Sequence, residues 1–162
     1  MKGDADKMAL RKIREMGDPV LGKVSKEVKD MNLRNRLLLQ DMFETMYKAE
    51  GVGLAAVQVG VLKRMIVIDI GEGPIVLINP VIIEQSGEQT GDEGCLSVPG
   101  YHGKVTRPDH VIVRAKDENM EERDIEGTGL LARCICHECD HLDGKMYVRL
   151  VEGGLVPNDA EE

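Results

Sequence analysis

The clearest candidates for chemistry are two histidines and a glutamate in the segment 137–141, which reads His-Glu-Cys-Asp-His. In a helix, residues four apart lie on one face, so the imidazoles of His137 and His141 can reach the same metal ion. Glu138 lies about 100° around the helix from the first histidine, close enough to take a proton from a water beside that ion. The chain contains only four histidines, so a pair at this spacing favours a metal hydrolase over a chance arrangement on a solvated helix.

A catalytic ion of this kind needs a third protein ligand and keeps a fourth position for water. In the pattern HExxHxxGxxH the third ligand is a histidine six residues after the second, and here that position holds Tyr147. A downstream glutamate would fall in an acidic tail that has no helical periodicity. The main remaining candidate is Cys95, in a polar, glycine-rich loop after a strand. Cys134 lies on the histidine face and competes for the role, although its apolar neighbours indicate core packing.

Cys136 and Cys139 form a CxxC pair, a spacing found in redox proteins and in one half of a structural zinc site. On a helix both would point away from the histidines, and no second pair in the sequence completes a four-thiol site. The chain has four cysteines, too few and too bunched for a disulfide framework. A thiol redox or metal-storage protein therefore stands as the alternative to a hydrolase.

Net charge and apolar content limit the partners of this chain. A net charge of −8 argues against a surface that neutralises many phosphates, so we expect no direct DNA binding. The apolar runs are far shorter than the roughly 20 residues of a membrane span, and the N-terminal segment has no apolar signal region. With 42% hydrophobic and 31% charged residues, the composition is that of a soluble globular protein. We expect a cytoplasmic protein without a membrane partner.

We expect a single domain over residues 1–162, with polar ends at 1–8 and 156–162 that fray. A first helix begins after Asn32, which can cap it, and its apolar residues recur with the helical period. Gly51 fits the left-handed position that ends such a helix. The apolar stripe predicts that this helix faces the core.

After this helix the pattern changes to that of strands. Segments rich in Val and Ile, separated by Gly, Asn, Asp or Pro, predict strands at 65–70, 75–84, 110–116 and 121–126. A second helix over 130–142 is expected to end at Asp143 and Gly144, followed by a short strand over 146–148. Because strands and helices do not alternate, the sequence predicts an α+β fold with mostly antiparallel pairing.

Three segments together resemble, in order and spacing, the motifs of peptide deformylases. They are GVGLAAVQ at 51–58, EGCLS at 93–97 and HECDH at 137–141. The likeness extends to 18–21, 79–80 and 142–144 and so covers nearly the whole chain. The resemblance implies antiparallel sheets that enclose the HExxH helix, with one further N-terminal core helix. It also implies a metal-dependent hydrolase that removes the formyl group from formyl-methionine of newly synthesised polypeptides.

The family's functional residues carry over onto the matching positions of this chain. The implied metal ligands are Cys95, His137 and His141. Glu138 would be the general acid and base, while the amide of Gln58 and the backbone N–H of Leu96 would stabilise the oxyanion. An extended substrate would pair with the backbone like an added strand. The residues implied for substrate contact are Val52, Gly53, Leu54 and Gly94.

The resemblance also implies the cofactor and the partners. One divalent metal ion per chain is expected, Fe(II) in the cell, with Zn, Ni or Co as alternatives. The partner would be the nascent formyl-methionyl polypeptide. Some members carry a C-terminal helix that contacts the ribosome, which leaves transient ribosome association open for this chain.

Two positions depart from the family pattern, since Cys136 stands where Gln is usual and Cys139 where Met is frequent. Neither is a ligand position. A general zinc peptidase remains an alternative, although it lacks a third His or Glu ligand. A catalytically inactive binding domain is the other, and it is hard to reconcile with an intact Glu138 and Gln58.

Overall fold

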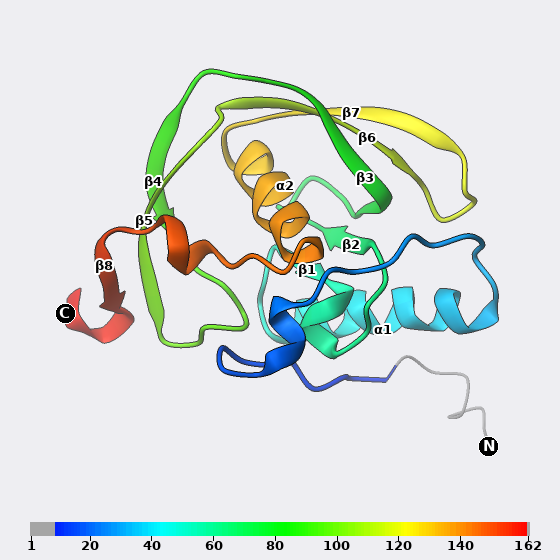
Figure 1. Cartoon of the computed structure of the whole chain (residues 1–162), viewed down its shortest axis with the longest axis horizontal. Coiled ribbons are helices and arrows are strands. Elements are labelled where there is room, and N and C mark those ends of the chain that lie inside the picture. Colours follow the sequence, from blue (N-terminus) through cyan, green and yellow to red (C-terminus); the bar gives the residue numbers. More distant parts are fainter. Residues whose placement is uncertain (1–8, 162) are drawn as a thin grey trace.

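The computed structural model describes residues 9–161, in which two sheets lie on either side of a central helix (Figure 1). Residues 1–8 and 162, which belong to the ends expected to fray, lie outside the described residues. The larger sheet has the order β1-β2-β3-β6-β7, and its strands are Gly53–Ala55, Met65–Ile68, Ile75–Ser86, His110–Lys116 and Glu122–Thr128. The smaller sheet has the order β4-β5-β8, and its strands are Gln89–Glu93, Tyr101–Arg107 and Glu152–Pro157. All these strands pair antiparallel, which confirms the α+β prediction.

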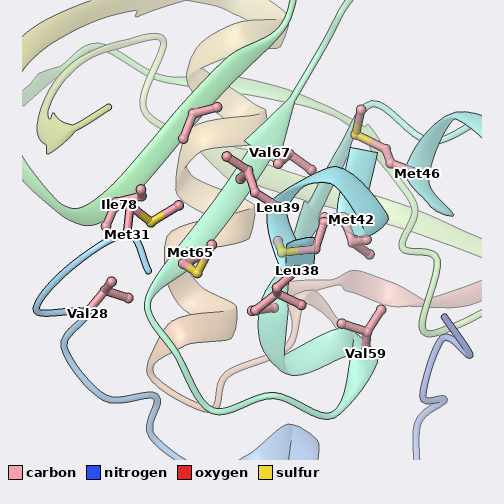
Figure 2. Packing of buried hydrophobic residues seen from close by; sticks show 13 residues of the cluster. Val28, Met31, Leu38, Leu39, Met42, Met46, Val59, Met65, Val67 and Ile78 are labelled. Carbon is pink, nitrogen blue, oxygen red and sulfur yellow. The ribbon is translucent and has the colours of Figure 1, made fainter. Parts of the chain in front are cut away.

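The first helix, α1 (Leu33–Lys48), covers one face of the larger sheet. The side chain of Asn32 caps it as expected, accepting a hydrogen bond from the N–H of Asn35 at 2.9 Å. The core beneath α1 is built from Met, Leu and Val, because the chain has no Trp, one Phe and three Tyr. Figure 2 shows these side chains, which include Leu38, Leu39, Met42 and Met46 of α1 against Met65, Val67 and Ile78 of the sheet. Burying each such side chain stabilises the fold by about 1.5–3 kcal/mol.

The end of α1 differs from the sequence prediction. The left-handed residue there is Glu50, with φ of 60°, whereas Gly51 does not have a positive φ. The predicted left-handed role of Gly51 is therefore wrong. Packing requires a glycine at position 51 instead, because a Cβ there would lie 2.6 Å from the Cδ1 atom of Leu96.

The second helix, α2 (Gly129–Leu142), carries the two histidines of the HExxH segment and was predicted almost to the residue. One side of α2 packs on the larger sheet through buried apolar residues such as Ala132 and Ile135. Its opposite side faces β4 and β5 of the smaller sheet (Figure 1). An amphipathic helix between two sheets can thus bury its apolar stripe and still present polar groups to a cavity.

The C-terminal part differs from the prediction in two places. The strand expected over 146–148 is wrong, because Tyr147 begins a 3₁₀ helix, Tyr147–Leu150. Its ring is buried against the ring of His137, with centroids 5.7 Å apart, instead of lying in a sheet. Residues 156 and 157, expected to fray, pair with β5 as the last residues of β8. The backbone of β5 supplies hydrogen-bonding partners that the sequence pattern of β8 does not reveal.

Candidate active site

The structure brings together the three residues predicted as metal ligands. The ligand atoms of Cys95, His137 and His141 all lie within 4.8 Å of one another, and the Cys95 Sγ is 3.3 Å from the His141 Nε2. Ligands at about 2.0–2.3 Å from a tetrahedral ion lie roughly 3.5 Å apart, so this spacing fits a single ion. One thiolate and two imidazoles suit Zn and several other divalent transition metals.

Cys95 reaches the histidines because it follows the last residue of β4 by two positions. It lies in a turn in which the N–H of Val98 donates to the carbonyl of Cys95 at 2.9 Å. Cys134, the competing candidate, is not part of the ligand group among residues 9–161. Its thiol is buried in α2, and burial raises its pKa to about 12. Cys136 and Cys139 pack with the apolar side of α2, away from the ligand group.

Glu93 orients one of the histidines, and sequence reasoning assigned it no role. Its Oε2 lies 2.5 Å from the Nδ1 of His137, which leaves the Nε2 of that ring for the ligand group. Two buried guanidinium groups also bind Glu93: Arg107 at 2.6 and 3.1 Å and Arg133 at 2.8 Å. Burial alone would raise the pKa of Glu93, but the hydrogen bonds from His137 and Arg107 outweigh it and lower the pKa to about 2. Glu93 is therefore a carboxylate that fixes the ring of His137.

Arg107 extends this network to α2, since its Nη1 donates to Asp140 at 2.8 Å. Arg149 donates to the same carboxylate at 3.2 Å. The network thus ties β4 and β5 to the helix that carries the histidines. Its members come from separate elements, so no local pattern in the sequence could reveal them.

Glu138 is 4% exposed, and its Oε1 has no hydrogen-bond partner within the described part of the chain. Burial raises the pKa of Glu138 to about 7, against an opposing effect of His137. A Cβ at Gly53 would lie only 2.7 Å from the Oε2 of Glu138, so the glycine makes room for this carboxylate. A buried carboxyl with a pKa near neutrality is suited to exchanging protons.

Gln58 lies on a short 3₁₀ helix, Ala56–Val59, and its amide is held at both ends. The Oε1 accepts a hydrogen bond from the N–H of Ala55 at 2.9 Å. The Nε2 donates to the Oγ of Ser97 at 3.0 Å and lies 3.6 Å from the Sγ of Cys95. These contacts direct the donor end of the amide toward the ligand group.

The backbone N–H of Leu96, the second predicted oxyanion donor, makes no hydrogen bond to another described residue. It lies one residue after Cys95, beside the ligand group. The Nε2 of Gln58 and the N–H of Leu96, the two predicted oxyanion donors, therefore both lie near Cys95.

A cavity of about 400 Å³ opens beside His137 and Glu138. Three of the four residues predicted to contact substrate line it: Val52, Gly53 and Gly94. Leu54 does not line this cavity, because its side chain is fully buried in the core beneath α1. Apolar side chains of Val98 and Leu130 line other parts of the wall.

Comparisons with family profiles, protein sequences and solved structures all point to the same family. The profile of the family described as Polypeptide deformylase matches residues 10–153. A peptide deformylase of Agathobacter rectalis is 66% identical over 148 residues, which cover 91% of this chain and 94% of that relative. The crystal structure of a peptide deformylase from Legionella pneumophila is 44% identical with a TM-score of 0.87, covering 90% of this chain and 88% of that chain.

A peptide deformylase from Synechococcus elongatus, solved in complex with actinonin, is 43% identical with a TM-score of 0.86. The match covers 91% of this chain and 83% of that chain. The chain therefore belongs to the polypeptide deformylase family, and it is an enzyme that removes the formyl group from the N-terminal methionine of newly made polypeptides.

Proposed function

We propose that this deformylase holds one divalent metal ion with Cys95, His137 and His141, and that the ion is Fe(II) in the cell. The observation that carries the proposal is the convergence of the three ligand atoms within 4.8 Å, from a loop and a helix far apart in the sequence. The family is metal-dependent, which supports the same reading. Zn, Ni or Co would fit the same donor set.

A divalent cation bound there supplies a Lewis acid that polarises a carbonyl and lowers the pKa of water. Glu138 accepts the proton of the attacking water and passes it to the leaving amine. As the formyl carbon is attacked, negative charge grows on its oxygen. The Nε2–H of Gln58 and the N–H of Leu96 donate to that oxygen, and such donors are most effective in the transition state.

The cavity walls fit the side chain of methionine. Val98, Leu130 and Cys134 contribute apolar surface, and an unbranched thioether can adapt to such a wall. Leu96 and Glu138 lie so close to Gly51 and Gly53 that a side chain at either glycine would clash with them.

The peptide that follows the methionine would lie along β1. Among the strands of the described chain, β1 pairs with β2 alone, so no strand occupies its other edge. Extended peptides add to such an edge through backbone hydrogen bonds. Gly53 of β1 and Gly94, after β4, both line the cavity, which supports their proposed contact with substrate.

Within residues 9–161, no helix is long and apolar enough to cross a membrane. We further propose a cytoplasmic enzyme that contacts the ribosome transiently, since its substrate is a nascent polypeptide.

The test offers purified, anaerobically handled protein three substrates: formyl-Met-Ala-Ser, acetyl-Met-Ala-Ser and casein. We expect rapid formate release from the first, little or no reaction with the second and no cleavage of the third. Glu138→Gln is the matched control for contaminating activity, because it changes one buried side chain without changing its size. Efficient cleavage of casein without formate release would mean that the protein is a general peptidase.

A further inference from the structure

Ser97 contacts the side chain proposed to stabilise the oxyanion. We propose that Ser97 is a positioning residue for deformylation, which acts by holding the amide of Gln58 in the orientation that presents its N–H to the substrate. The inference rests on the proposed role of Gln58. Ser97 would act through its neighbour, because its hydroxyl bonds Gln58 and is not part of the ligand group.

The geometry around the amide supports this role. A glutamine amide can present either its oxygen or its N–H₂ to a site, and its hydrogen-bond partners decide which. Here the N–H of Ala55 occupies Oε1 at 2.9 Å, and the Oγ of Ser97 accepts from Nε2 at 3.0 Å. With one N–H engaged by Ser97, the second N–H of the same nitrogen is directed toward the Sγ of Cys95 at 3.6 Å, beside the ligand group where the oxyanion would form.

Ser97 and Gln58 are also tied together through their backbones. The N–H of Arg14 donates to the carbonyl of Gln58 at 2.7 Å, and the N–H of Met16 donates to the carbonyl of Ser97 at 2.8 Å. The segment that makes both bonds is anchored to α1, because the N–H of Arg11 donates to the Oγ1 of Thr45 in that helix at 3.0 Å. The backbones of Gln58 and Ser97 are therefore held at a fixed separation by the same N-terminal segment.

Removing the hydroxyl of Ser97 would leave Nε2 with one neighbouring acceptor, the Sγ of Cys95 at 3.6 Å. Both Ser97 and Gln58 are buried, at 0% and 1% exposed, so bulk water does not reach the amide in place of the hydroxyl. The amide would then sample orientations that do not serve the oxyanion. We expect kcat to fall about tenfold, the size of one net hydrogen bond, while KM stays within about twofold.

The experiment is a double-mutant cycle with Ser97→Ala, Gln58→Leu and the double variant, all loaded with nickel and assayed on formyl-Met-Ala-Ser. Gln58→Leu should lower kcat by about 10²–10³. In that background Ser97→Ala should have little further effect, because its action passes through Gln58. Ser25→Ala is the matched control: it also removes a buried serine hydroxyl, one without a hydrogen-bond partner in the described chain, and kcat should not change. Metal content and Tm are measured for every variant.

If Ser97→Ala lowered kcat by the same factor with and without Gln58, the two residues would act independently and the inference would be wrong. Loss of metal in proportion to kcat in Ser97→Ala would likewise overturn it, since Ser97 would then support the ligand loop. An unchanged kcat in Gln58→Leu would instead refute the oxyanion role of Gln58 in the proposed function. The two failures are thus distinguishable.

Discussion

Replacing Glu93 with glutamine tests the buried charge network most directly, because it keeps the side-chain shape and removes the charge. The side chain of Glu93 is 4% exposed, so solvent screens its interactions weakly. Its pKa falls from an ordinary 4.5 to about 2, a difference worth about 3 kcal/mol at roughly 1.4 kcal/mol per pH unit. Breaking a buried ion pair typically costs about 3–5 kcal/mol, which gives a similar magnitude. Arg107 and Arg133 maintain part of this stabilisation when His137 is neutral.

We therefore expect Glu93→Gln to lower the free energy of unfolding by up to about 3 kcal/mol, or Tm by up to roughly 12 °C for a chain of this length, with part of that loss absent when His137 is neutral. Urea unfolding and thermal unfolding at pH 7, with matched metal loading, measure the loss. Asp124→Asn is the control, since its ion pair with Arg114 at 2.9 Å has side chains 44% and 49% exposed. Such a surface pair contributes less than about 1 kcal/mol. Equal losses in the two variants would refute the role given to the buried network.

The same substitution has a defined pH dependence. The pKa of Glu93 is lowered in the folded protein, so its ionised form stabilises the fold above about pH 4.5. That stabilisation is lost as the pH falls through 4.5 toward 2. The difference in stability between the parent protein and Glu93→Gln should therefore be constant near neutral pH and shrink in acid. A glutamine can also donate to the Nδ1 of His137, so metal affinity should fall by about 10–100-fold.

The remaining predictions concern the ligand group and the cysteines near it. Cys95→Ala should purify with well under one metal ion per chain and no deformylase activity, and full metal content by mass spectrometry would exclude Cys95 as a ligand. Glu138→Gln should retain its metal ion while kcat falls by about 10²–10⁴, because the proton acceptor is lost. If its residual activity instead tracked metal occupancy, Glu138 would itself be a ligand. Replacing Cys136 with Gln and Cys139 with Met should leave kcat/KM within a few-fold, because both side chains point away from the ligand group. A collapse of the activity of the unsubstituted protein under reducing conditions would revive a redox role for this pair.

The sequence predicted those elements whose pattern is local. The helical period and the histidine spacing located α2, and runs of Val and Ile located β2, β3, β6 and β7. It missed β1 and β5. It also missed β4, which reads QTGDE, and β8, which reads EGGLVP. Neither has the composition of a strand, and both form because the backbone of β5 lies between them. Strand formation of this kind depends on tertiary context more than on propensity.

The site was predictable where a residue type carries the chemistry itself, as for the thiol of Cys95 and the carboxyl of Glu138. It was not predictable where a residue acts through a partner. Glu93 meets His137 across 44 positions, and Ser97 meets Gln58 across 39. The sequence showed only that Glu93 and Ser97 lie on either side of Cys95 in the segment EGCLS. That position does not reveal which residues their side chains bond.

That position has a structural consequence for the loop that carries Cys95. On one side Glu93 binds His137 of α2, and on the other Ser97 binds Gln58 of the 3₁₀ helix. A loop fixed at both ends has little conformational freedom left to lose when its thiol joins the ligand group, so the site is preorganised. The two anchors should nevertheless fail differently. Loss of the Glu93 charge alters the ring that would bind the metal ion, whereas loss of the Ser97 hydroxyl alters only the amide that meets the oxyanion. Metal affinity and kcat therefore separate the two anchors experimentally.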